Sequence, residues 1–233
     1  MSPGPETQGP QLDHLVVAAH SLAQGVQWCQ GVLGVTPGAG GVHPLMGTHN
    51  RLALLSSGQY PACYLEIIAI DPDVTPQKPA DQARWFGLDE PALQTRLQQS
   101  PQLVHWVARV PNLANALATC AAHGVHPGEA VRASRPTAQG LLSWDISVPH
   151  SGRPAAEGLW PTLIAWGEQH PCTTLPASGL ALTRLELQHP DAASLNALWR
   201  DLGGAAERFT PGSAQLKAQL ATPRGAITLC TGL

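Results

Sequence analysis

The sequence predicts an α+β protein built from two tandem βαβββ modules (a strand, a helix and three further strands) and a C-terminal half-module. The first observation is an internal repeat, because residues 12–34 and 103–124 both begin with an apolar, strand-like run and continue into a helical pattern. Aligning the two segments places His14 on His105. The second observation is that each copy is followed by three short strand-like runs.

The first module is expected within residues 12–71. After the initial strand, Leu22, Val26 and Leu33 recur at helical spacing, and Gly34 is typical of the residue that ends a helix. The three strand-like runs that follow lie around 41–45, at 50–57 and at 63–70.

The second module is expected within residues 102–170, with its three later strands at 129–135, 141–148 and 159–167. The modules are joined by a linker at 72–101. This linker is rich in proline at first and ends in a helical pattern for which Asp89 is the expected N-cap.

Residues 1–11 are expected to form a flexible leader, and residues 178–233 a partial third repeat packed on the same domain. Its strand and helix occupy 182–203, where Arg184 takes the place of the repeated histidine, and its last strand falls at 225–232. A metal site built on that histidine is therefore not expected in the third repeat.

Composition narrows the function. Only 12% of the 233 residues are charged and the net charge is -3, without the basic stripe of a nucleic-acid-binding protein. The apolar runs are too short to span a membrane. The five scattered cysteines never form a CxxC pair, and the first residues lack the features of a signal peptide, which together indicate a reducing cytoplasm. We expect a small-molecule ligand, no nucleic-acid or membrane partner, and a monomer or homodimer.

Two tandem βαβββ modules resemble the vicinal oxygen chelate superfamily, which includes glyoxalase I, extradiol dioxygenases and bleomycin-resistance proteins. The resemblance covers residues 12–167. Within it, GAGGVHPLMGTHNRLALL (38–55), YLEIIA (64–69) and WGEQHP (166–171) are similar to the glyoxalase-like domain family of bacterial proteins. The resemblance implies a cupped mixed sheet that encloses one cavity.

A first candidate site is the pair His14 and Glu66. Glu66 is a carboxylate within an apolar run, where burial is costly unless the group is paired, protonated or bound to metal. Strand alternation places His14 on the opposite face from Asp13 and Leu15. The resemblance implies that the first and fourth strands of a module are neighbours, so His14 would lie beside Glu66. The pair then suits a divalent metal such as Zn, Fe, Mn or Ni, or forms an ion pair without metal.

His105 is the third candidate metal ligand, because the resemblance implies that the first strand of the second module supplies one. The alternative is a histidine packed in the core beside Trp106. The fourth ligand position of the superfamily falls on Thr162, which is a poor ligand, so the four-ligand pattern of glyoxalase I is broken.

His43 lies among turn-forming residues and is the candidate general acid or base. Alternatively, His43 could be a replacement metal ligand, or its ring could form a hydrogen bond that caps the turn. Asn50 and Arg51 are candidate substrate-binding residues. The alternatives are that Asn50 fixes the turn and that Arg51 forms a surface ion pair.

Arg135 and Trp144 are candidate substrate-binding residues in a partly aromatic pocket wall, with Trp144 as a core residue in the alternative. Trp85 and Trp160 are further aromatic candidates for the cavity wall. The alternative is that both belong to the core, as large aromatic side chains often do.

The predicted function is a glyoxalase-like, metal-dependent enzyme of the lyase, isomerase or dioxygenase type, acting on a small oxygen-rich substrate bound to a divalent metal. The alternative is a non-catalytic binding or resistance protein of the bleomycin-resistance type. The sequence contains no GxGxxG after its first strand and no GxxxxGK[ST], GxSxG or HExxH, which disfavours dinucleotide, nucleotide, serine-hydrolase and zincin chemistry.

Overall fold

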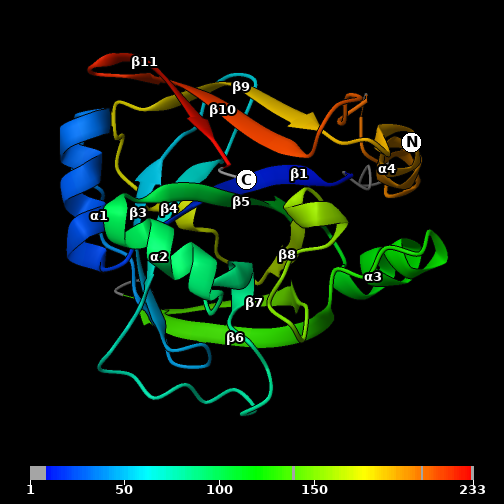
Figure 1. Cartoon of the computed structure of the whole chain (residues 1–233), viewed down its shortest axis with the longest axis horizontal. Helices are drawn as coiled ribbons and strands as arrows, with labels where there is room; N and C mark the ends of the chain where they lie inside the picture. Colours follow the sequence, from blue (N-terminus) through cyan, green and yellow to red (C-terminus); the bar gives the residue numbers. More distant parts are fainter. Residues whose placement is uncertain (1–8, 138–139, 206, 232–233) are drawn as a thin grey trace, which may run out of the picture.

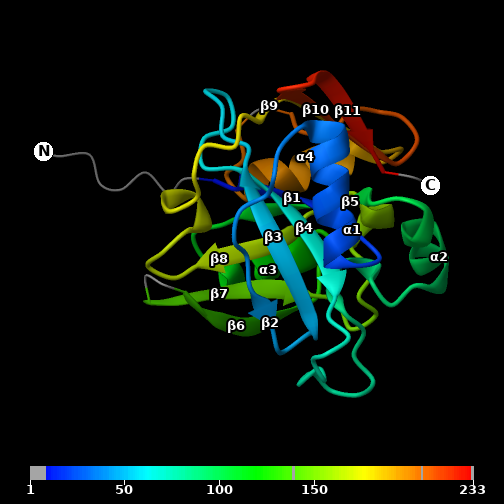
Figure 2. The same cartoon turned by 90° about the vertical axis from the view of Figure 1, so that its left-hand side faces the viewer.

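The computed structural model describes residues 9–137, 140–205 and 207–231. Its strands form two sheets. The larger sheet has eight strands in the order β2-β3-β4-β1-β5-β8-β7-β6, and the smaller has three in the order β11-β10-β9. Figures 1 and 2 show the larger sheet curving into a cup, with the smaller sheet on its outer face.

The first module contains β1 (Gln11–Ala18), α1 (Leu22–Trp28), β2 (Val42–His43), β3 (Thr48–Leu54) and β4 (Tyr64–Ile70). Its first and fourth strands pair in parallel and its third and fourth pair antiparallel. The Ser21 side chain accepts a hydrogen bond from the Gln24 N–H and so caps α1. A π-helical turn (Cys29–Leu33) follows α1 and ends at Gly34, whose φ of 75° suits glycine.

The second module contains β5 (Gln102–Arg109), α3 (Leu113–Ala122), β6 (Glu129–Thr137), β7 (Gly140–Val148) and β8 (Thr162–Trp166). It repeats the pairing of the first, because its first and last strands are parallel. The two modules join through β1 and β5, which pair antiparallel at the centre of the sheet. The far edges also meet, since Arg135 on β6 donates a hydrogen bond to the carbonyl of Gly40, before β2. The cup is therefore nearly closed.

The linker helix α2 (Pro91–Gln99) begins one residue later than it would with Asp89 as its N-cap. The N-cap is Glu90, so the prediction of Asp89 as N-cap is wrong. The reason is a competing partner, because the Asp89 carboxylate accepts hydrogen bonds from the backbone N–H and the guanidinium of Arg84.

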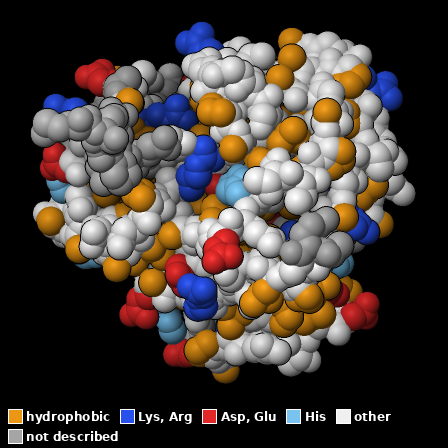
Figure 3. Space-filling model, turned by 180° about the vertical axis from the view of Figure 1, so that it is seen from behind, with side chains coloured by type: hydrophobic (Ala, Val, Ile, Leu, Met, Phe, Trp, Pro, Cys, Tyr) orange, Lys and Arg blue, Asp and Glu red, His pale blue; other side chains and the backbone are white. Residues whose placement is uncertain are grey.

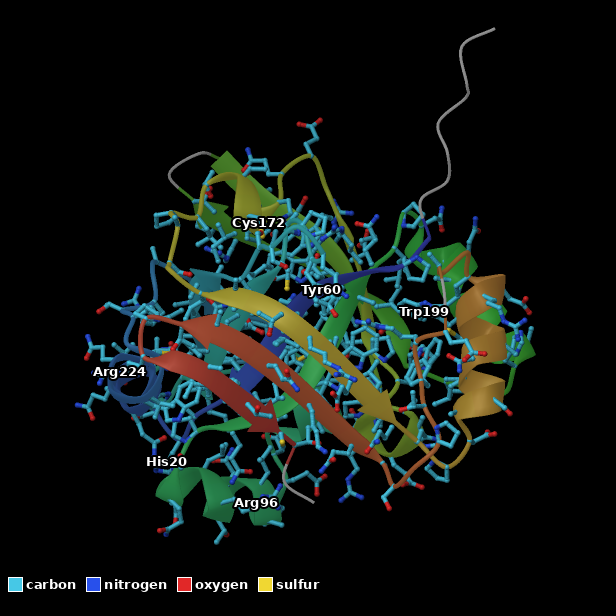
Figure 4. The ribbon with its side chains drawn as sticks, turned by 90° about the horizontal axis from the view of Figure 1, so that it is seen from above. His20, Tyr60, Arg96, Cys172, Trp199 and Arg224 are labelled. Atoms are coloured by element: carbon cyan, nitrogen blue, oxygen red, sulfur yellow. The ribbon has the colours of Figure 1, made fainter. Side chains whose placement is uncertain are left out.

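The C-terminal part contains β9 (Ala181–Gln188), α4 (Ala192–Asp201), β10 (Gln215–Thr222) and β11 (Gly225–Cys230). Figure 4 shows its three strands crossing above β1 and β5, with the labelled Trp199 pointing from α4 towards the interior. Trp199 packs there with Trp106, Trp160 and Phe209. The half-module thus covers the outer face of the sheet and buries it.

Two apolar clusters lie on the two faces of the sheet. The outer cluster includes Leu15, Leu65 and Trp106, and the inner cluster, which lines the cup, includes Val16 and Ile68. Alternation along β1 and β4 therefore directs His14 and Glu66 into the cup. Across the described residues, the helices are too short or too polar for a membrane span.

Candidate functional site

A small cavity of about 30 Å³ lies inside the cup. We call it the inner cavity. Its polar lining residues are His14, His43, Asn50, Tyr64, Glu66 and Arg135. Its apolar wall is mainly aromatic and includes Trp85, Phe86, Trp144 and Trp166. The polar side chains come from both modules, and all but Arg135 are buried.

Asn50 holds one oxygen of Glu66 in place. The Asn50 Nδ2 donates to Glu66 Oε1 at 2.6 Å and lies 3.3 Å from Nε2 of His43. Its Oδ1 accepts from the backbone N–H of Gly41 at 2.9 Å. Every polar atom of the Asn50 amide therefore has a partner, which fixes the orientation of the amide and of the Glu66 carboxylate.

Asp13 holds His14 from the other side. Its Oδ1 lies 2.6 Å from Nδ1 of His14, and its Oδ2 lies 2.9 Å from both Nε2 of His170 and Nε1 of Trp166. Asp13 is fully buried. Burial by itself raises the pKa of Asp13, but hydrogen bonds with His14 and His170 and the charges of these histidines outweigh it and hold that pKa well below its usual range.

A shift in strand register explains why Asp13 can reach His14. Between Leu12 and His14, two residues of β1 oppose one step of β5, as in a β-bulge at Asp13. A bulge re-aims the side chain, so the alternation expected from the sequence is broken there. The ionised Asp13 accepts a hydrogen bond from Nδ1–H of His14, which leaves Nε2 facing the inner cavity.

His14 and Glu66 face each other across the inner cavity. The distance from His14 Nε2 to Glu66 Oε2 is 3.6 Å. The ring of Tyr64 stacks on His14, with the ring centroids 4.5 Å apart. Burial raises the pKa of Glu66, against the lowering effect of His14, Asn50 and Arg135. A neutral His14 and an ionised Glu66 would place two acceptor atoms opposite each other, and a positive charge between them would stabilise this arrangement.

His43 has protein partners at both ring nitrogens. Its Nδ1 lies 3.0 Å from Oγ1 of Thr48, and its Nε2 faces Asn50. Its ring also packs edge-on against Trp85 and Trp144. Burial, reinforced by the positive charge of Arg135, lowers the pKa of His43 to about 3. His43 is therefore neutral in the folded protein over the physiological range and supports Asn50.

The glycines before His43 let the chain approach Asn50. A Cβ atom at Gly40 would lie 2.1 Å from the carbonyl oxygen of Asn50 and 2.3 Å from its Oδ1. No side chain fits in that space, which accounts for glycine in the GGxH part of the motif. The motif thus positions Asn50 and, through it, Glu66.

His105 also faces the inner side, but its hydrogen-bond partners are Gly158 and Thr162. Its Nδ1 lies 3.1 Å from the carbonyl oxygen of Gly158, and its Nε2 accepts from the backbone N–H of Thr162 at 3.0 Å. Burial lowers the pKa of His105 to about 3. Because both ring nitrogens are used, His105 has no lone pair to offer to the inner cavity.

The other predicted residues separate into two groups. Arg135, Trp144 and Trp85 line the inner cavity together with His14 and Glu66. Arg51 is exposed, on the opposite face of β3 from Asn50, and Trp160 belongs to the outer cluster.

Five residues of the site were not predicted, namely Asp13, Tyr64, Phe86, Trp166 and His170. Trp166 and His170 belong to the WGEQHP motif, which served only to indicate the family. Their shared function is to hold Asp13, and a search for partners of a buried Asp next to His14 would have identified them. Tyr64 could have been predicted, because it lies two residues before Glu66 and therefore on the same face of the strand.

The residues offer at most two side chains to one metal ion. Within the described ranges, no group of three or more His, Cys, Asp or Glu side chains is arranged to hold a metal. The predicted set of His14, Glu66 and His105 does not fit, because His105 is already bonded at both nitrogens. His14 Nε2 and Glu66 Oε2 remain as the two donor atoms that face each other.

Sequence and structure comparisons place the chain in a family. The sequence profile described as a glyoxalase-like domain matches residues 12–203, so the chain belongs to this family. A comparison with curated proteins finds no match. The family and the observed module pairing confirm the predicted fold class and the resemblance to the vicinal oxygen chelate superfamily.

Three solved structures are similar to this chain at low sequence identity. A hypothetical protein from Staphylococcus aureus is 13% identical with a TM-score of 0.56, over 95% of this chain and 85% of that chain. A methylmalonyl-CoA epimerase from Streptomyces coelicolor, in complex with 2-nitronate-propionyl-CoA, is 14% identical with a TM-score of 0.43, over 68% of this chain and 98% of that chain. The epimerase from Mycobacterium tuberculosis is 15% identical, with a TM-score of 0.37, over 70% and 91%.

Proposed function

We propose that this protein is an enzyme that binds a small oxygen-rich substrate in the inner cavity and transfers a proton at the His14–Glu66 pair, in a reaction of the lyase or isomerase type. The observation that carries the proposal is the 3.6 Å separation of His14 Nε2 and Glu66 Oε2, both buried and both directed into one cavity. Perturbed, buried acid–base groups in a cavity are typical of catalytic sites.

The chain supports a simple division of roles. In the reacting form of the site, Glu66 acts as the carboxylate base, and His14, held by the hydrogen bond to Asp13, donates from Nε2–H. Oε2 of Glu66 removes a proton from a carbon next to a carbonyl group. The C–H electron pair forms the carbon–carbon double bond, the carbonyl π pair moves to the oxygen, and the resulting enolate oxygen accepts a hydrogen bond from Nε2–H of His14. Return of the proton completes the reaction.

A divalent metal such as Zn, Fe, Mn or Ni is the other positive charge that fits between the pair. His14 and Glu66 would be its two protein ligands, and Asp13 would orient His14 as carboxylates do for metal-bound histidines. Such an ion would act as a Lewis acid on a substrate oxygen, which could also serve dioxygenase-type chemistry. In either case His43 and Asn50 have a positioning role, because they orient Glu66 rather than face the reacting atoms.

A non-catalytic ligand-binding protein is the second candidate. The observation that favours it is the aromatic wall of Trp85, Phe86, Trp144 and Trp166, which suits the burial of a flat ligand without chemistry.

We also propose a cytoplasmic location. The five cysteines, all free thiols, agree with it.

Exchange of substrate hydrogens with solvent tests the proposal. The protein is incubated in D₂O with pyruvate, hydroxyacetone and dihydroxyacetone, and deuterium incorporation next to the carbonyl is followed by ¹H NMR. We expect incorporation above the protein-free rate for at least one probe. Thermal stabilisation by a probe without exchange, in metal-free protein and after addition of each metal, would instead support the binding protein.

Elemental mass spectrometry of protein purified without a His-tag shows whether the positive charge between His14 and Glu66 is a metal ion or a proton. Stoichiometric metal that is lost in Glu66→Gln would assign a metal to the pair. Exchange by metal-free protein would assign the proton.

A further inference from the structure

A larger cavity of about 500 Å³, which we call the vestibule, lies against the inner cavity. Both are lined by Leu52, Arg135, Leu142 and Pro171. The inner cavity has room for about one water-sized group, so it admits only the reacting end of a substrate. The remaining part of the substrate must therefore lie in the vestibule.

The vestibule opens between the β6–β7 hairpin and the loop after β8. Its lining includes Pro136, Thr173, Thr174 and Pro176. Both segments lie on the side of the molecule that Figure 3 shows, where His, Lys or Arg, and Asp or Glu side chains lie near the middle of the face.

Arg135 is the charged residue that the two cavities share. The described lining of the vestibule contains no Asp or Glu. The guanidinium of Arg135 is half-buried, and its Nη1 donates to the Gly40 carbonyl at 3.0 Å. Among the described residues no carboxylate lies within ion-pair distance of it. By contrast, Arg132 on the same strand pairs with Asp145 at 2.9 Å.

An unpaired, half-buried guanidinium is costly to desolvate and presents a planar fork of N–H donors. That fork matches the two oxygens of a carboxylate. A phosphate dianion would need further cations, and His170, the other basic residue of the vestibule lining, is already bonded to Asp13 and to the Cys172 N–H. The charge balance therefore favours a single negative charge.

We propose that Arg135 binds a carboxylate of the substrate at the junction of the two cavities, so that the substrate is a monoanionic carbonyl compound whose remaining part lies in the vestibule. The proposal rests on the proposed function for the carbonyl and adds the carboxylate. The position of the guanidinium is fixed from both edges of the sheet, because Arg135 belongs to β6 and its side chain fills the space beside Gly41.

The test compares two probes that differ in charge and little in shape, pyruvate and its neutral methyl ester. Dissociation constants are measured by calorimetric titration for the parent, Arg135→Gln, Arg135→Lys and the control Arg132→Gln, each checked for folding by circular dichroism. We expect the parent and Arg132→Gln to bind pyruvate at least about tenfold more tightly than the ester. This preference should disappear in Arg135→Gln and be reduced in Arg135→Lys, which lacks the fork.

Absence of the preference in the parent, failure of the parent to bind pyruvate, or a full preference in folded Arg135→Gln would each overturn the assignment. The same titration in Glu66→Gln separates this proposal from the proposed function. Charge preference without solvent exchange in the parent would contradict proton transfer and leave the carboxylate site intact. Exchange without charge preference would do the reverse.

Discussion

Replacing Glu66 with Gln is expected to reduce solvent exchange by about 10²- to 10⁴-fold, the usual contribution of a positioned acid or base. Gln has nearly the same shape, and its side-chain oxygen can still accept the hydrogen bond from Asn50. Its amide N–H can donate towards His14 Nε2, so the fold should be retained. The exchange rate per enzyme is measured by ¹H NMR under the conditions used for the parent.

The same substitution should change how stability depends on pH. The pKa of folded Glu66 lies above its ordinary 4.5, so the folded state binds more protons than the unfolded state above that pH. The stabilising effect of this proton is present below pH 4.5 and is lost as pH rises through the folded pKa. Urea unfolding across this range should show that decline in the parent and a weaker one in Glu66→Gln. The exposed Glu129→Gln is the matched control, and equal pH slopes in all three proteins would refute the role of burial.

Replacing Asp13 with Asn is expected to destabilise the protein by about 3–5 kcal/mol, the cost of breaking a buried charged network. Asp13 is fully buried and accepts hydrogen bonds from His14, His170 and Trp166. An Asn amide has only one oxygen, so its NH₂ group would face at least one of these donors. Denaturant unfolding measures the loss. The control is Asp145→Asn, which removes an exposed ion pair and should cost at most about 1 kcal/mol.

The contribution of Asp13 to stability depends on pH in the opposite direction from that of Glu66. Its folded pKa is depressed below the ordinary 3.8, so its stabilisation is present above that pH and is lost as pH falls through the folded pKa. The parent should therefore lose stability in acid more steeply than Asp13→Asn. A cost for Asp13→Asn no larger than that of the control would show that the network is not needed for folding. Exchange activity should also fall, because an Asn does not stabilise a cationic His14.

The fold was accessible from the sequence because it is repetitive. The repeated strand–helix segment at 12–34 and 103–124 predicts two modules, and parallel pairing of the first and last strands in each module follows the family resemblance. The neighbouring positions of His14 and Glu66 follow from the same pairing. Burial of a carboxylate within an apolar strand was the local signal that marked Glu66.

The remaining parts of the site depend on contacts that local patterns do not encode. The bulge at Asp13 breaks the two-residue alternation on which the assignment of faces was based. The partners of His105 come from Gly158 and Thr162, more than fifty positions along the chain, and they bring the main chain to its ring. The approach of Arg135 to Gly40 required the closure of the cup, which only the full set of strand registers determines.

The protonation state of the His14–Glu66 pair tests the central claim most directly. In metal-free protein, the ¹⁵N shifts of the His14 ring and the ¹³C shift of the Glu66 carboxyl are followed across the neutral pH range, with Glu66→Gln used for assignment. We expect the pair to hold one proton in addition to that on Nδ1, either as imidazolium beside carboxylate or as neutral imidazole beside a carboxylic acid. A neutral His14 with a bare Nε2 beside an ionised Glu66 in folded, metal-free protein would contradict the account.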